Sequence, residues 1–153
     1  MQQVISKLIQ AAGIAMLMLS TSSEAAGEAG MIKSVKGTVN IERDGGSVAA
    51  KPGSLLMVSD TVVTGAESSV GITLEDGTLL SAGPKSTLTL NKFIFDSTTS
   101  KGALDASLKH GTLAVVSGKL SKTSQDAVTY RTPTVILGVR GTEFVIDTDS
   151  ENK

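Results

Sequence analysis

The sequence predicts an all-β protein, either a small β-sandwich or an irregular, solenoid-like β-roll of short strands. Three observations lead to this prediction. Apolar and polar residues alternate over many short stretches, which is the period of a strand with one buried face. Sixteen glycines and three prolines, with abundant threonine, serine and valine, are typical of strands joined by tight turns. Beyond the first 25 residues, no stretch has the period of a helix of convincing length.

The first 25 residues have the pattern of a secretory signal peptide. Lys7 supplies a basic start, Leu8–Leu19 is a short apolar core, and Ser23-Glu24-Ala25 offers small residues at a cleavage site. The alternative is a membrane-spanning helix, which needs roughly 20 apolar residues. We predict cleavage after residue 25, a disordered start over residues 26–30, and no membrane span in the mature chain. The mature protein is then expected in the periplasm or outside the cell.

Composition excludes several classes of function. The net charge is -1, so nothing in the composition argues for a nucleic-acid-binding surface or a polybasic membrane contact. Aromatic residues make up only 3% of the chain and tryptophan is absent, which argues against a stacking surface for bases or sugars. There is no cysteine, so disulfides, thiolate metal ligands and thiol catalysis are excluded.

The strand pattern runs from residue 31 to residue 147, which we predict to be one β domain. Asp76-Gly77 lies between two alternating stretches and predicts a hairpin turn. The apolar residues change parity near Asn91-Lys92, which predicts a β-bulge or a strand covered on both faces. Residues 96–102 and 117–127 are polar and predict loops. Residues 148–153 are predicted to be an acidic tail.

A short unit recurs along the domain. A Gly-Thr pair precedes strand-like residues at four places, although the spacings are too irregular for a strict solenoid. The glycines of these pairs are Gly37, Gly77, Gly111 and Gly141. We expect each pair to mark a turn that is followed by a strand.

The sequence contains no convincing catalytic, cofactor or metal site, and we expect no enzyme activity. His110 is the only histidine and has no second histidine or cysteine with which to share a metal. Glu75-Asp76 is not a catalytic pair, because adjacent strand residues face opposite ways and Asp76 is explained by its turn. Asp147, Asp149 and Glu151 alternate, but they lack the spacing of a calcium loop and are expected to be solvated.

The stretch from Tyr130 to Ile146 has the most distinctive sequence. Its apolar, β-branched run is apolar on both faces, which predicts a strand buried on two sides, then a glycine turn at Arg140-Gly141 and a second strand. We expect the Arg140 guanidinium to be tied to backbone carbonyls or to a carboxylate such as Asp60 or Glu143. The alternative is an exposed anchor for an anionic ligand or partner.

This stretch, read as TPTVILGVRGTEFVI over Thr132–Ile146, closely resembles the signature of the FecR-domain family of bacterial periplasmic modules. Gly37–Val39, Asp60–Gly65 and Leu74–Leu79 fit the same family, so the resemblance spans roughly residues 31–146. It implies that five signature residues are structural and candidate partner contacts: Thr132, Pro133, Arg140, Gly141 and Thr142. It also favours a strand over a helical turn at residues 103–109.

The resemblance implies a secreted, non-enzymatic binding or sensing module of the bacterial envelope. Members that regulate sigma factors also carry a cytoplasmic helical domain and a transmembrane helix, which this sequence does not show, so direct sigma-factor control is not expected. The alternative is a structural or scaffolding component of the cell envelope or extracellular matrix.

The expected partner is another envelope protein. The family pattern often continues into a further hairpin, so the strand over Thr142–Asp147 is a candidate open edge, where a partner or a second copy adds a strand. The alternative is that an earlier strand of the same domain covers it.

Overall fold

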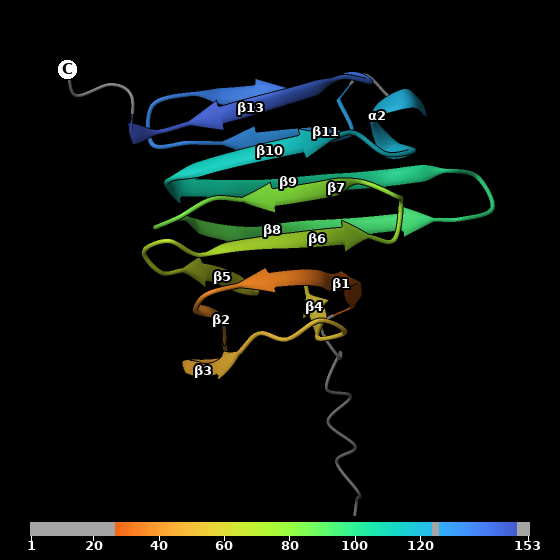
Figure 1. The fold of residues 1–153 in the computed structure, drawn as a ribbon. Helices are drawn as coiled ribbons and strands as arrows, with labels where there is room; N and C mark the ends of the chain where they lie inside the picture. Colours follow the sequence, from red (N-terminus) through yellow and green to blue (C-terminus); the bar gives the residue numbers. More distant parts are fainter. Residues whose placement is uncertain (1–26, 124–125, 150–153) are drawn as a thin grey trace, which may run out of the picture.

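The computed structural model describes residues 27–123 and 126–149, and the all-β prediction is confirmed. Two sheets pack face to face, and the short helix α2 (Leu120–Thr123) lies beside them (Figure 1). The six-stranded sheet has the order β13 (Glu143–Asp147), β10 (Thr112–Val116), β7 (Leu79–Ala82), β6 (Ser69–Leu74), β1 (Glu28–Lys36) and β4 (Leu55–Met57). The seven-stranded sheet has the order β12 (Ile136–Gly138), β11 (Val128–Arg131), β9 (Lys101–His110), β8 (Thr87–Asp96), β5 (Thr61–Thr64), β2 (Val39–Arg43) and β3 (Gly46–Ala49).

The chain builds both sheets together from one end to the other. It passes from one sheet to the next every one or two strands, so β1 to β4 form one end of the sandwich and β10 to β13 the other (Figure 1). All strand pairs are antiparallel except β11 with β9. The last strand of each sheet therefore lies at the same end of the molecule.

The core fills the space between the sheets. Alternate residues of the strands point inward, as in β6, where Val70, Ile72 and Leu74 are buried and the residues between them are not. Leu80 and Leu113 on the same sheet, and Leu104 and Leu108 on the opposite sheet, are also fully buried. Apolar residues alternate with polar ones in the sequence because each sheet buries only one of its faces.

The four Gly-Thr units are turns, as expected. All four glycines have positive φ, and each unit leads into a strand, namely β2, β7, β10 and β13. At Gly37 and Gly111 a side chain would collide with Ser68 and Ser86. The hydroxyl of Ser68 accepts the N–H of Thr38 at 2.9 Å, and that of Ser86 accepts the N–H of Thr112 at 3.1 Å. These two turns are therefore built alike.

Several local expectations hold. The turn at Asp76-Gly77 joins β6 to β7, and the register of β8 with β9 shifts between Leu90 and Lys92, which is the predicted bulge. Residues 103–109 lie within strand β9.

Other expectations need correction. The start over residues 26–30 is not disordered where it is described, because β1 begins at Glu28 and Ala29 is fully buried. The loop over residues 117–127 contains α2, and the loop over residues 96–102 is shorter than predicted, since β9 begins at Lys101. The predicted signal peptide lies outside the described residues.

The stretch from Tyr130 to Ile146 also differs from its prediction. Thr132–Val135 is a tight turn in which Thr132 N–H donates to Val135 C=O at 2.8 Å, and it joins β11 to a three-residue strand, β12. β12 is not buried on two sides: Ile136 is 64% exposed. The apolar run is exposed because β12 is the last strand of its sheet and has a neighbour on one side only.

Candidate functional site

The candidate site is the end of the sandwich formed by two edge strands, β12 and β13. β13 pairs with β10 on one side, and β12 pairs with β11 on one side. Among the described residues no strand lies on the other side of either. Of the two arrangements considered for Thr142–Asp147, the structure therefore has the open edge, formed by Glu143–Asp147.

The hydrogen bonds of β13 show which of its backbone groups face outward. Ser117 N–H donates to Thr142 C=O at 3.3 Å, and Thr148 N–H donates to Gly111 C=O at 3.0 Å. In an antiparallel pair the bonded residues alternate, so the backbone groups of Phe144 and Ile146 face β10. Those of Glu143, Val145 and Asp147 point away from β10, toward the open side.

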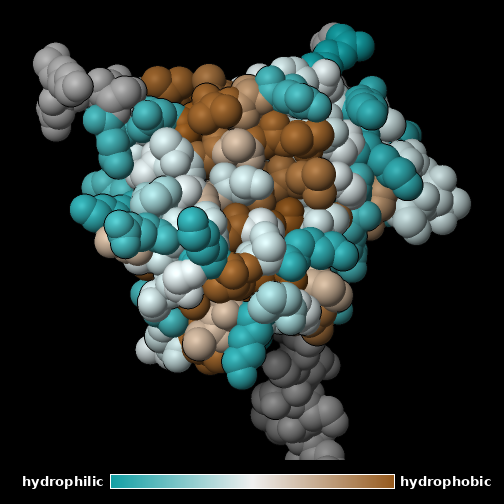
Figure 2. All heavy atoms as spheres, in the orientation of Figure 1, coloured by the Kyte–Doolittle hydropathy of each residue, from teal (hydrophilic) through white to brown (hydrophobic). Residues whose placement is uncertain are grey.

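The side chains at this end are unusually apolar for a surface. Val145 is 70% exposed, Ile136 is 64% exposed and Val135 is 46% exposed. A hollow of about 300 Å³ lies between the two edges, with Leu137 on the β12 side and Ile146 on the β13 side. Figure 2 shows hydrophobic side chains gathered toward the β13 end of the face that it presents. Exposed apolar groups of this kind are typical of interaction sites.

The outer face of the six-stranded sheet carries an apolar row that ends at β13. The cross-strand pairs place four exposed hydrophobic residues and one threonine at the same level of five neighbouring strands: Leu55, Met31, Thr73, Leu79 and Val116. The next residue of the row is Glu143 on β13. A second hollow, of about 350 Å³, lies on this face between Leu79 and Val145. β13 thus has a hollow on each side.

The expected contact between the Arg140 guanidinium and the Asp60 carboxylate is wrong. Asp60 is buried and is held by Arg43, whose Nε and Nη2 donate to its two carboxylate oxygens at 2.7 and 2.6 Å. This hydrogen bond raises the pKa of the Arg43 guanidinium. Arg140 is exposed, and within the described ranges it has no hydrogen bond or ion pair. It is exposed because the segment that carries it crosses from one sheet to the other outside the core.

The other signature residues surround the same end. Thr132 and Pro133 form the turn before β12, where the Thr132 hydroxyl accepts the N–H of Val135 at 3.0 Å. Gly141 has a φ of 58° in the crossing between β12 and β13. The Thr142 hydroxyl donates to Glu143 C=O at 3.0 Å. The structure therefore brings all five signature residues into the two connections that hold the edge strands.

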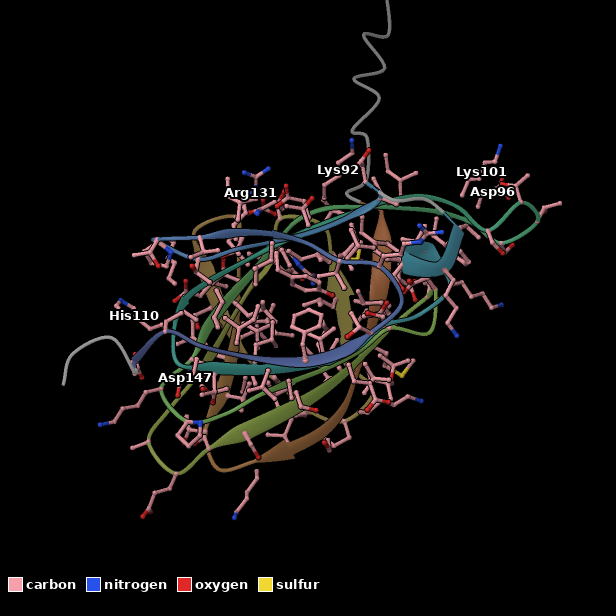
Figure 3. The ribbon with its side chains drawn as sticks, turned by 90° about the horizontal axis from the view of Figure 1, so that it is seen from above. Lys92, Asp96, Lys101, His110, Arg131 and Asp147 are labelled. Carbon is pink, nitrogen blue, oxygen red and sulfur yellow. The ribbon has the colours of Figure 1, made fainter. Side chains whose placement is uncertain are left out.

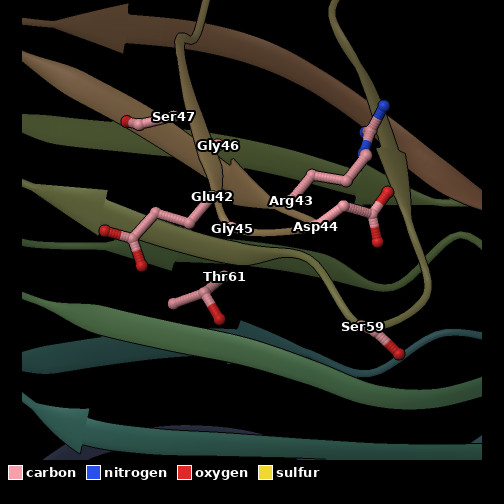
Figure 4. A pocket seen from close by; sticks show the side chains of 8 residues that line it. All are labelled: Glu42, Arg43, Asp44, Gly45, Gly46, Ser47, Ser59 and Thr61. Atoms are coloured by element: carbon pink, nitrogen blue, oxygen red, sulfur yellow. The ribbon is translucent and has the colours of Figure 1, made fainter.

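A polar hollow of about 420 Å³ lies at the opposite end, around the turn between β2 and β3 (Figure 4). Glu42 and Arg43 point to opposite sides of this turn, as adjacent strand residues do. Because Arg43 is engaged by Asp60, its charge is already matched within the protein. This hollow is shallow and polar, and it carries no functional argument.

Asp76 has a wider role than the turn that its sequence predicts. This residue is buried, accepts hydrogen bonds from Thr78 N–H and Thr78 Oγ1 at 3.0 and 2.8 Å, and accepts another from Leu120 N–H at 3.3 Å. It thereby ties the β6–β7 turn to α2. The turn signal at Asp76-Gly77 was visible in the sequence, but the contact with Leu120 spans 44 positions and has no local signal.

The histidine and the carboxylates do not gather into a metal site in the part of the chain that the structure describes. It contains no group of three or more histidine, cysteine or carboxylate residues able to hold a metal. His110 is exposed at the corner between β9 and β10, where Asp147 also lies (Figure 3). Asp96 and Lys101 are at the tip of the β8–β9 hairpin, far from that corner (Figure 3). Backbone hydrogen bonds from Thr98 and Thr99 lower the pKa of Asp96.

Together these features define an all-β sandwich domain in which β12 and β13 are the edge strands of the end that carries the signature residues. The family model described as FecR protein matches residues 60–153, which is more than half of the chain and includes the edge strands. The chain belongs to the FecR family, a regulatory and signalling family of envelope-associated proteins. No curated protein and no solved structure matches this chain. Across residues 27–123 and 126–149, none of the helices is long and apolar enough to cross a membrane.

Proposed function

We propose that this protein is a non-enzymatic binding or sensing module of the bacterial envelope, and that another envelope protein binds it by strand addition at Glu143–Asp147. The observation that carries the proposal is the open edge of β13. The backbone groups of Val145 point away from β10, and its side chain is 70% exposed. Such an edge is a template for a strand of another chain.

The surroundings of β13 support the same proposal. A strand placed beside β13 extends the six-stranded sheet and covers the hollow on each side. The five signature residues lie in the connections that place β12 and β13, so they act on binding by holding the edges in position. Arg140 is the exception, because its exposed guanidinium is available to an anionic group of the partner.

The decisive experiment is affinity capture from a periplasmic extract with a matched pair of variants. Val145→Pro removes an N–H that faces the open side and leaves the bonds between β13 and β10 in place, so the fold is expected to persist. Val145→Ala shortens the side chain and keeps the N–H. We expect the wild type and, more weakly, Val145→Ala to capture the same protein, and Val145→Pro to lose it. Equal capture by all three would refute binding at this edge.

The proposed location is tested separately. We propose that residues 1–25 direct export and are removed, so that the mature chain begins near Ala26. Intact-mass measurement of protein from a bacterial host checks this. Recovery of the full-length chain in the membrane fraction would contradict it.

A second function is favoured by a different observation. At the opposite end of the sandwich, β3 and β4 are also edge strands, and Val48 and Leu55 are 67% and 44% exposed. Open edges at both ends allow copies to stack head to tail, which is the arrangement of a structural or scaffolding component of the envelope. Assemblies that grow with protein concentration, measured by sedimentation velocity, would favour this function over the sensing module.

A further inference from the structure

We infer that the strand bound by β13 has a central apolar segment flanked by basic residues, in the order basic, apolar, apolar, apolar, basic. This inference rests on the proposed strand addition and specifies the chemistry of the partner. It comes from the alternation of charge along β13 and from the environment of each of its two faces.

The outer face of β13 presents an acidic, an apolar and an acidic side chain, namely Glu143, Val145 and Asp147. These are also the residues whose backbone groups point toward the open side. Side chains directly opposite one another on neighbouring strands lie about 4.5–5.5 Å apart, so the partner residues next to these three share their face. Opposite charges in such pairs are favourable and like charges are unfavourable.

The strand on the other side of β13, which is β10, does not supply a countercharge for Glu143. The residues of β10 opposite Glu143, Val145 and Asp147 are Val116, Ala114 and Thr112. Asp147 also accepts the N–H of Asp149 at 2.9 Å, so Glu143 is the stronger determinant of the two. A partner strand thus meets an acidic group at each end of the edge. Because the pattern is symmetric about Val145, a basic–apolar–basic strand fits in either direction.

The inner face of β13 favours apolar residues in the bound strand. Phe144 and Ile146 point toward the space between the sheets, where Phe144 stacks edge-on against Tyr130 with ring centroids 5.3 Å apart. A partner residue beside Ile146 enters the hollow between β12 and β13, which Ile146 lines, and a partner residue beside Phe144 lies next to the Phe144 ring. A charged side chain placed there would lose its hydration without gaining a partner. The two inward positions of the bound strand are therefore apolar.

A second copy of this chain does not meet these requirements. The antiparallel register that pairs all five residues of β13 with a second β13 is centred on Val145. It places Glu143 of one copy opposite Asp147 of the other, twice. Two pairs of like charges oppose this dimer. β3 and β4, the edge strands at the opposite end, contain no basic residue either. The occupant of the β13 edge is therefore a different protein segment with basic residues at these positions.

The test uses three synthetic peptides that share identical polar ends. Their five-residue cores are three valines flanked on each side by lysine, by glutamine or by glutamate. Binding to the full chain is measured by calorimetry at low salt, and protection of the Val145 amide is followed by hydrogen exchange. We expect affinity in the order lysine, glutamine, glutamate, with roughly a tenfold ratio between the first and the last. This ratio should fall as salt is added.

Matched variants test whether the preference among the three peptides arises from the charges of β13. Glu143→Gln should reduce the lysine-to-glutamate ratio several-fold. Glu42→Gln makes the same change in charge on an exposed residue of β2 and should leave the ratio unchanged. Equal affinity of the three peptides, with the Val145 amide protected, would overturn the charge pattern but leave strand addition intact. Absence of protection with every peptide would overturn strand addition itself, and this inference with it.

Discussion

Asp60 and Arg43 form the best-defined ion pair of the described residues. The Asp60 carboxylate is 1% exposed, and it also accepts the N–H of Met57 at 2.8 Å. Arg43 Nη2 donates in addition to Leu55 C=O at 3.1 Å. The pair therefore ties β2 to β4 and to the start of β5, and it is this aspartate that Arg140 was expected to hold.

Stability should depend on Arg43 and not on Arg140. Arg43→Ala leaves a buried carboxylate with one backbone donor, and because Arg43 is itself half exposed we expect a loss of about 1–2 kcal/mol in the free energy of unfolding. Arg140→Ala removes an exposed side chain and should change it by less than about 0.5 kcal/mol. Urea unfolding of both variants measures this. Equal losses would mean that Arg140 has a structural role after all.

Gly141 should be sensitive to substitution through its backbone conformation. Its φ is 58°, and the nearest atom to an added Cβ would be Lys122 Cγ at 3.9 Å, so a side chain has room but a strained backbone. Gly141→Val is expected to cost roughly 1–2 kcal/mol of unfolding free energy. Gly141→Asn should cost less, because asparagine tolerates this region better. Gly27→Val, where the space is open, is the control for thermal unfolding. Identical melting temperatures for all of these proteins would contradict the prediction.

Tyr130→Phe should leave the protein as stable or make it more stable. The Tyr130 hydroxyl is buried and has no hydrogen-bond partner among the described residues. Removing an unsatisfied buried hydroxyl is expected to add roughly 1 kcal/mol to the free energy of unfolding, while the ring keeps its contact with Phe144. A loss of stability would show that the hydroxyl is bound.

The same residue should weaken the fold at alkaline pH. Burial, and then the charge of Asp76, raise the pKa of Tyr130. Because the pKa is higher in the folded state than in the unfolded state, the fold favours the protonated hydroxyl. The stability that depends on this protonated form is complete below pH of about 10 and is lost as pH rises toward the folded pKa. Tyr130 is the only tyrosine, and tryptophan is absent, so ultraviolet absorbance reports its ionisation directly. The difference in stability between wild type and Tyr130→Phe should change above pH of about 10; a constant difference would contradict this.

Amide exchange along β13 should alternate. In dilute protein the amides of Phe144 and Ile146 are bonded to β10 and should exchange slowly, whereas the Val145 amide should exchange fast. Residue-resolved hydrogen exchange by NMR checks this. Slow exchange at Val145 in the monomer would mean that the edge is already covered.

Reversing one charge on β13 should allow copies to pair. Glu143→Lys turns both like-charge contacts of the Val145-centred register into opposite-charge contacts. We expect dimers at concentrations at least about tenfold lower than for the wild type, measured by sedimentation equilibrium. Glu42→Lys makes the same change in charge elsewhere and should not dimerise more readily. Absence of dimers with Glu143→Lys would show that charge is not what keeps β13 from pairing with itself.

The sequence by itself determined the fold class, the turns and the family. These properties are local: the alternation in β6, the turn at Asp76-Gly77 and the bulge near Asn91-Lys92 all follow from neighbouring residues. The glycine turn at Arg140-Gly141 was also predicted from its place between two apolar runs. The family signature is read from consecutive residues, so it needs no knowledge of the sheets.

Only the tertiary structure decided which strands are edges and which charges meet. The apolar run of β12 has the composition of a buried strand, yet it is exposed because the sheet ends there. The sequence could not assign Asp60 to Arg43 instead of Arg140, since neither arginine is next to Asp60 in the sequence and the choice depends on how β2 and β5 pair. Burial and ion pairing depend on contacts between residues distant in sequence, and these contacts cannot be predicted from the pattern of neighbouring residues.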